Sequence, residues 1–430
     1  MQIWPRVFLF LVVGYLTMTR SFAYLGIPQA KLFIGELAIG GFLLTRPRAV
    51  FDRWLTALAA PSPLAGFALA FTCFLAYGSF ELARGITLGY STILALQGFA
   101  FHYYPICFLL GLWAGGQDPT LLRRLVRAGA WVNGIYGLLF ILFLNTIAIP
   151  LPGTDVRLLG QPAGSAVFVI GLLSLEPNLS RVWHLIVLNL LVMLGLQVRA
   201  EFLGFAVGLL VWGFFGRQMG RVVAGVSAVA ALLIIGFVTD FQMPAPSTRG
   251  GQISTRDIIG RVISPVDPEL AAEYSETAKT TAGTAEWRIV WWRAIWNTIH
   301  DSTETALIGE GYGYPLADLV GYSERDIRTP HNVFFYALAY GGWIGVVLFF
   351  ALQATVAHLL WLGSKFSGTP CGLAIWALFF CGAFFGNAFE TPFGAIPLYL
   401  ISGLAAAPAL MKVAPYASPA RAQLLSAARW

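Results

Sequence analysis

Apolar segments separated by short polar connections run along almost the whole chain. Twelve of them approach the roughly 20 residues that a helix needs to cross a membrane, although several are short or closely spaced. They lie at about 4–19, 26–45, 63–80, 91–114, 128–149, 162–177, 182–198, 200–216, 221–239, 332–362, 369–387 and 393–411. This pattern predicts an all-α polytopic membrane protein with about 12 transmembrane helices.

One long polar stretch interrupts the pattern between the ninth and tenth segments. We therefore expect nine transmembrane helices at 1–239, a loop at 240–331, three more transmembrane helices at 332–412 and a tail at 413–430. Helical periodicity from about 284 to 300 indicates that the loop is partly helical.

The composition agrees with this architecture. Hydrophobic residues make up 57% of the chain and charged residues 11%, and the mean hydropathy is +0.72. About a quarter of the residues in a soluble domain are charged, so a soluble globular protein is excluded. The four cysteines fall inside predicted segments without a CxxC pair, so we expect neither a disulfide framework nor a zinc site.

The distribution of basic residues predicts the orientation, because Lys and Arg accumulate in short cytoplasmic loops. With the N-terminus in the cytoplasm, 14 basic residues lie in short inner loops and termini. Five lie at the outer ends, namely Arg20, Lys31, Arg84, Arg157 and Arg199. We therefore expect both termini in the cytoplasm and the long loop outside. The net charge of +6 follows from this sorting, and without a basic run no nucleic-acid partner is expected.

The helical part of the loop is dense in tryptophan and suited to the membrane surface, where indole rings favour the headgroup level. Trp287 and Trp291 share one face with Ile295, and Arg288 shares the adjacent face with Trp292 and Trp296. A plain interfacial anchor would explain the tryptophans. Arg288 is expected in the first turn, where the helix dipole disfavours a structural cation and favours an anion.

Two further arginines are candidates for binding an anion. Arg199 lies between two apolar segments, where a charge is costly to insert and marks a functional site by default. Glu201 is close enough to pair with Arg199, and Glu81 stands three residues before Arg84. Structural ion pairs are therefore the alternative for both. Arginine suits phosphate because its planar fork donates two parallel hydrogen bonds and remains charged when poorly hydrated.

His331 is the candidate base. We expect Thr329 to cap the tenth transmembrane helix and Pro330 to be its first residue, which places His331 in the opening turn. There the helix dipole and an adjacent arginine would keep the imidazole neutral, able to accept a proton from a hydroxyl. The alternative is a histidine that only caps the helix or bonds across the loop.

Together these features resemble the O-antigen ligase and O-antigen polymerase superfamily of integral membrane glycosyltransferases. The resemblance is carried by Arg288 in a Trp-rich helix, the run Ile308-Gly-Glu-Gly-Tyr-Gly313, and His331-Asn332 followed by Leu338, Gly342 and Gly345. The large loop between the ninth and tenth segments also agrees. Arg199 is similar to the family's arginine at the outer start of a helix, but Val198 and Ala200 flank it where Ser-Arg-Gly is more usual.

The resemblance implies a glycosyltransferase C-like enzyme in the bacterial inner membrane, with its active site facing the periplasm. It would move a glycan from undecaprenyl pyrophosphate to an acceptor hydroxyl, with inversion and without a metal or cofactor. His331 would be the base, with the pyrophosphate held by Arg288, Arg199 and, as a possible third, Arg84. Substrate binding would further involve Asn332, Trp292 and the glycines Gly309, Gly311 and Gly313.

The acceptor and the reaction class have alternatives. The most direct expectation is an O-antigen ligase that uses lipid A-core, in lipopolysaccharide biosynthesis. A polymerase that extends the growing glycan and a protein O-oligosaccharyltransferase would use the same residues. A transporter of lipid-linked sugars would need charges at mid-bilayer, for which Glu36 is a candidate, and broken helices in both halves. A peptidoglycan polymerase would rely on an outer aspartate such as Asp267, Asp301 or Asp318.

Overall fold

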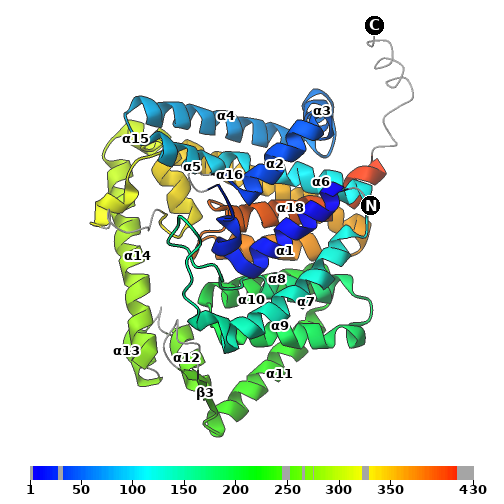
Figure 1. Ribbon diagram of the computed structural model, residues 1–430, viewed down its shortest axis with the longest axis vertical. Helices are drawn as coiled ribbons and strands as arrows, with labels where there is room; N and C mark the ends of the chain where they lie inside the picture. Colours follow the sequence, from blue (N-terminus) through cyan, green and yellow to red (C-terminus); the bar gives the residue numbers. More distant parts are fainter. Residues whose placement is uncertain are drawn as a thin grey trace.

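The computed structural model describes residues 3–27, 32–244, 252–263, 267–274, 276–321 and 329–413, and these are predominantly α-helical (Figure 1). The expected tail lies outside the described residues, apart from its first position, as does part of the long loop.

The first part of the chain forms the helices α1 to α11. Their bounds are α1 Ile3–Ala23, α2 Ile34–Thr45, α3 Pro47–Ala59, α4 Ala65–Thr87, α5 Thr92–Tyr103, α6 Ile106–Gln117, α7 Leu121–Leu142, α8 Ser165–Leu175, α9 Trp183–Leu196, α10 Arg199–Phe215 and α11 Met219–Val238. Strands β1 (Gly26–Ile27) and β2 (Leu32–Phe33) pair antiparallel between α1 and α2. The 3-10 helices η2 (Leu144–Thr146) and η3 (Leu179–Arg181) lie in the connections before α8 and α9.

The long loop is more helical than its sequence suggests. It contains β3 (Gln242–Pro244), β4 (Gln252–Ser254), α12 (Thr255–Ile263), α13 (Pro268–Tyr274), α14 (Glu276–His300), α15 (Thr303–Ile308) and the 3-10 helix η5 (Leu316–Val320). Strands β3 and β4 pair antiparallel. The chain then continues through α16 (Val333–Ser367), α17 (Cys371–Gly382) and α18 (Pro392–Val413).

The all-α, multi-span architecture is confirmed, but the number of long apolar helices is below twelve. Among the described residues, six helices are long and apolar enough to cross a membrane, or seven if the pair α5 and α6, bent by 42°, forms one span. Four shorter apolar helices of 10–17 residues, α2, α8, α9 and α17, account for most of the difference. Hydropathy does not show which part of an apolar run is helical: of the described residues in segment 26–45, Gly26–Ile27 and Leu32–Phe33 are paired strands and Ile34–Thr45 is a helix.

Close packing brings the backbones of several helices into direct contact. A Cβ at Gly111 of α6 would lie 2.2 Å from the Leu400 carbonyl oxygen of α18, and one at Gly403 would lie 2.1 Å from the Phe108 carbonyl oxygen. Small residues allow such approach where lipid supplies no hydrophobic driving force between helices. In the same way α10 packs along α17, where a Cβ at Gly204 would lie 2.9 Å from the Leu378 carbonyl oxygen.

The described ends of the chain lie on one side of the molecule. In Figure 1, α14 and α15 lie at the left edge, whereas the N-terminus and the end of α18 lie at the right. The helices α4, α16 and α18 run between these two sides. The long loop therefore covers the face opposite to both ends.

Candidate functional site

Arg288 lies in the middle of α14 rather than in its first turn. The helix begins at Glu276, so more than two turns precede Arg288, and the expected effect of the helix N-terminus on this residue is wrong. Residues 276–283 lack apolar periodicity, which is why the sequence suggested a later start. The position of Arg288 is fixed instead by the packing of its helix, because Trp291, Ile295 and Ile299 of α14 are fully buried.

The tryptophan face of α14 packs on other helices. The Trp291 indole N–H donates to the Leu316 carbonyl of η5 at 2.8 Å, and the Trp292 indole N–H donates to the Pro330 carbonyl at 2.8 Å. The Trp292 ring also stacks on Phe335 of α16, with ring centroids 5.4 Å apart. Trp292, expected at the substrate, thus uses its single donor within the protein.

His331 precedes α16 instead of lying in its first turn. The N-cap is Asn332, whose side-chain oxygen accepts from the N–H groups of Phe334 and Phe335, so the expected cap at Thr329 is wrong. His331 itself has φ of 53°, a left-handed conformation that cannot belong to the helix. Asparagine is among the strongest N-cap residues, and here tertiary contacts select it over threonine.

The three predicted catalytic side chains lie close enough to interact electrostatically. Burial, together with the charge of Arg288, lowers the pKa of His331 to about 4. Burial and the charge of Arg199 lower the pKa of Arg288. The imidazole is therefore neutral near pH 7, as the sequence predicts, although burial rather than a helix dipole is the main cause.

Arg288 retains an unused donor. Its Nη1 donates to the Phe385 carbonyl at 3.1 Å, whereas its Nε is buried and finds no acceptor among the described residues. A buried, unsatisfied guanidinium N–H is costly, so it marks a position where an anion would be stabilised.

Arg199 begins α10, and Glu201 follows in the same turn. The Glu201 carboxylate accepts from the backbone N–H of Ala166, at the start of α8, at 3.3 Å. Glu201 therefore has a structural contact of its own, joining α10 to α8.

The segment 383–385, after α17, is a structural support that the sequence did not reveal. Its three carbonyls accept in turn from the Val333 N–H at 2.9 Å, from the Asn332 amide at 3.1 Å and from Arg288 Nη1 at 3.1 Å. This segment joins α14 to the start of α16. Backbone acceptors leave no residue-type signal, although the polar Asn387 and Glu390 close by in an apolar region were a weak one.

The glycine loop after α15 adopts conformations that need glycine, as expected. Gly309, Gly311 and Gly313 have φ of 69°, 82° and 94°. The loop fits into a kink of α16 at Gly342, where φ is 57°, because the N–H groups of Glu310 and Gly311 donate to the carbonyls of Ala339 and Tyr340.

Arg84 holds this loop in place. Its Nη1 contacts Glu81 at 2.8 Å and the Ile308 carbonyl at 3.1 Å, and its Nη2 donates to the Gly309 carbonyl at 2.7 Å. Tyr312 adds a second attachment, since its hydroxyl lies 2.6 Å from Nε2 of the buried His102. Arg84 therefore acts as a structural clamp on this loop.

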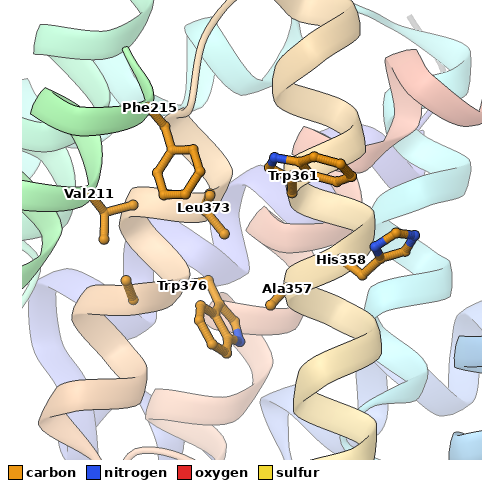
Figure 2. Close-up of a pocket in the computed structure, with 8 residues that line it drawn as sticks. Val211, Phe215, Ala357, His358, Trp361, Leu373 and Trp376 are labelled. Carbon is orange, nitrogen blue, oxygen red and sulfur yellow. The ribbon is translucent and has the colours of Figure 1, made fainter. Parts of the chain in front are cut away.

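Two other kinds of site, a metal site and an apolar groove, do not belong to this cluster. Within the described residues, no group of three or more His, Cys, Asp or Glu side chains is placed to hold a metal ion. An apolar groove of about 380 Å³ lies between α10, α16 and α17 (Figure 2). Its lining includes Ala357 and Trp361, near the C-terminal end of α16, whereas His331 precedes the N-terminal end.

The fold and the site together define a class: a multi-span, all-α membrane protein in which two arginines and a neutral histidine lie close together beside a long, partly helical loop. Residues 184–350 match the family model described as O-antigen ligase, and the chain thus contains a domain of this family. The resemblance predicted from the sequence is confirmed. The match extends from α9 into α16 and includes Arg199, Arg288 and His331. No curated protein matches the chain. The family implies an enzyme of the glycosyltransferase type that acts on lipid-linked glycans.

Proposed function

We propose that the protein transfers a glycan from undecaprenyl pyrophosphate to an acceptor hydroxyl, as an O-antigen ligase that uses lipid A-core. The proposal rests on one observation: Arg199, Arg288 and His331 lie close enough to interact, and the imidazole is neutral at physiological pH. Two cations beside a neutral base suit a reaction in which a phosphate ester leaves while a hydroxyl attacks.

Arg199 and Arg288 bind the pyrophosphate. Negative charge on this group grows as the bond between the anomeric carbon and the phosphate oxygen breaks, and stabilising such developing charge is usually the largest catalytic contribution. The Nε of Arg288, which has no acceptor in the described part of the chain, supplies a donor for this group. The arginines thereby provide the positive charge that a divalent ion provides in other sugar transferases.

His331 accepts the proton of the acceptor hydroxyl. The hydroxyl oxygen forms the new bond to the anomeric carbon, the bonding electrons of the old bond leave with the pyrophosphate, and attack opposite the leaving group inverts the configuration. A positioned general base of this kind contributes about 10²–10⁴ in rate.

We further propose that the chain has twelve spans, with both termini in the cytoplasm and the site facing the periplasm of the bacterial inner membrane. Every predicted segment contains a helix or the α5–α6 pair, and α10 and the four shorter apolar helices would complete the seven longer spans. The common side of the N-terminus and the end of α18 in Figure 1 supports an even number of spans.

The test is transfer by the purified full chain in liposomes containing undecaprenyl-pyrophosphate glycan, with a chelator present. One set of vesicles carries lipid A-core and another a lipid-linked glycan as acceptor, which separates a ligase from a polymerase. We expect transfer to lipid A-core that survives chelation and falls by about 10²-fold or more in His331→Ala. Transfer should also be lost in Arg288→Ala, and Arg293→Ala is its matched control, because Arg293 is exposed on the same helix. Undiminished product in His331→Ala would contradict the role of the base.

A transporter of lipid-linked glycans is the second candidate, and the bent pair α5–α6 favours it. Beside this bend, the Glu36 carboxylate accepts from the hydroxyls of Tyr103 at 3.4 Å and Tyr104 at 3.1 Å. Ionisable groups and broken helices at mid-membrane are typical of transporters. Movement of donor across the vesicle membrane without transfer to either acceptor would favour this function over the first.

A further inference from the structure

His331 has a left-handed backbone conformation. Its φ of 53° lies in a region that residues other than glycine enter uncommonly, although histidine enters it more often than most side chains do. Such a conformation persists only where the surrounding structure imposes it, and it is often found at functional sites.

The residues on either side of His331 are both fixed by hydrogen bonds. On the N-terminal side, the Pro330 carbonyl accepts from the Trp292 indole N–H at 2.8 Å. On the C-terminal side, Asn332 caps α16 and donates to the Phe384 carbonyl at 3.1 Å. Since both neighbours are held, the backbone of His331 can only bridge the two fixed points.

We propose that Trp292 is a positioning residue for His331: its indole N–H holds Pro330 and thereby keeps His331 in the left-handed conformation beside Arg288. The inference rests on the proposed role of His331 as the base. It replaces the expectation that Trp292 binds substrate, because the only donor of the indole is already used.

The packing of α14 explains why this bond is well suited to positioning. The stacking of Trp292 on Phe335, with ring planes 10° apart, fixes the indole against α16. One turn earlier, Trp287 approaches the His331 ring edge to face, with centroids 6.2 Å apart. The same helix therefore holds the backbone of His331, contacts one side of its ring and, through Arg288, contributes to its low pKa.

The first test compares Trp292→Phe with Trp291→Phe in the full chain, in the liposome assay described above. Phenylalanine at 292 keeps an aromatic ring for Phe335 and removes the N–H. Because a misplacement of about 1 Å can cost roughly 10²-fold, we expect kcat to fall about 10- to 100-fold. The KM for the donor should change by less than about threefold, since ground-state binding is retained.

Trp291→Phe is the matched control, since Trp291 is adjacent, fully buried and also bonded to a backbone carbonyl, that of Leu316. We expect it to lower the thermal stability while leaving kcat within about threefold of the wild type. A rise in the donor KM of Trp292→Phe with kcat unchanged would overturn the proposal, because it would mean that Trp292 binds substrate directly.

The second test removes only the hydrogen-bond donor of Trp292, its indole N–H. Incorporation of 3-benzothienylalanine at position 292 replaces the indole N–H by sulfur and keeps the ring shape. We expect the His331 pKa, measured by NMR on labelled histidine, to rise from its low value as the imidazole moves away from Arg288. A pKa equal to that of the wild type would overturn the proposal whatever the activity.

The two proposals fail in different ways. Absence of transfer by the wild type with every acceptor would contradict the proposed function, and the His331 pKa in the Trp292 variants would still decide whether Trp292 positions the histidine. Transfer that depends on His331 but is unaffected by either change at Trp292 would contradict the positioning role alone.

Discussion

At the scale of single residues, the environment of His331 decides its chemistry. Burial removes water from the imidazole, and the Arg288 charge further disfavours protonation, so the pKa falls to about 4. A base with this pKa is unprotonated at any pH near neutrality. It is also a weaker base than a free histidine. The bound donor pyrophosphate is an anion near Arg288, and its negative charge should raise the pKa of His331 during turnover.

The pH dependence of transfer follows from this shift. We expect kcat/KM for the donor to stay constant as the pH is lowered through 6 and to fall only near the His331 pKa of about 4. In Arg288→Gln the midpoint of the fall should move to higher pH, because the charge that disfavours protonation is gone. Arg293→Gln should leave the midpoint in place. An unmoved midpoint in Arg288→Gln would contradict the coupling between Arg288 and His331.

The same shift affects stability in a defined direction. The folded-state pKa of His331 lies below the unfolded value of about 6.5, so the folded state binds fewer protons. The corresponding stabilisation is present above pH 6.5 and is lost as the pH falls toward 4. Thermal unfolding of His331→Gln should therefore depend less on pH in this window than unfolding of the wild type.

At the scale of elements, the contact between the glycine loop and the kink of α16 holds the long loop against α16. A Cβ on Gly309 would lie 2.6 Å from the Gly342 nitrogen, and a Cβ on Gly342 would lie 2.4 Å from the carbonyl group of Leu307. The loop is therefore a structural joint between α15 and α16. Arg84 and Tyr312 attach the same joint to α4 and α5.

Gly342→Ala should destabilise this joint by about 2–4 kcal/mol, because the backbone at φ 57°, ψ −162° suits glycine alone and the new methyl group meets backbone atoms. Gly341→Ala is the control: its Cβ would meet only the Tyr77 side chain, at 3.2 Å. Thermal unfolding in detergent measures both. Equal unfolding temperatures for the two variants would contradict the structural role of the kink.

The Arg84–Glu81 pair should behave as a buried ion pair. Glu81 is fully buried and Arg84 is 14% exposed, so Arg84→Gln leaves an uncompensated carboxylate and should cost roughly 3–5 kcal/mol. The double variant Glu81→Gln, Arg84→Gln should be less destabilised than the sum of the single variants. Additive effects in thermal unfolding would show that the pair is not coupled. A selective loss of glycan-donor binding in Arg84→Gln would indicate that Arg84 binds the substrate.

At the scale of the whole molecule, the helices carry the long loop to the face opposite both described ends of the chain (Figure 1). Arg199, Arg288 and His331 lie close to one another, and Arg288 and His331 belong to this loop. The apolar groove lies apart from them, near the C-terminal end of α16.

Cysteine labelling tests the orientation. In a chain without its four native cysteines, Asp301→Cys at the end of α14 should react with an impermeant maleimide from the periplasmic side. Arg48→Cys, on α3, should react only after the membrane is opened, because both positions are exposed but lie on opposite faces in the proposed topology. Labelling of both from the same side would contradict the twelve-span arrangement.

The sequence by itself determined the class of the protein, and it predicted the region of the candidate site and its charged residues. Apolar runs and rare charges within them are local properties, and the cost of placing them in a membrane can be judged without coordinates. The role of the loop glycines could likewise be predicted, because glycine is the residue that most readily adopts the positive φ found at all three positions.

Only the tertiary structure decided how these residues are held. The choice of Asn332 over Thr329 as cap, the left-handed conformation of His331 and the structural use of Arg84 all depend on backbone acceptors supplied by distant segments, above all 383–385 and 308–309. A carbonyl is present at every residue, so no sequence pattern shows which carbonyls will accept a hydrogen bond from a distant side chain. The helix count differed for a related reason, because hydropathy records burial in an apolar medium and does not record where a helix bends or ends.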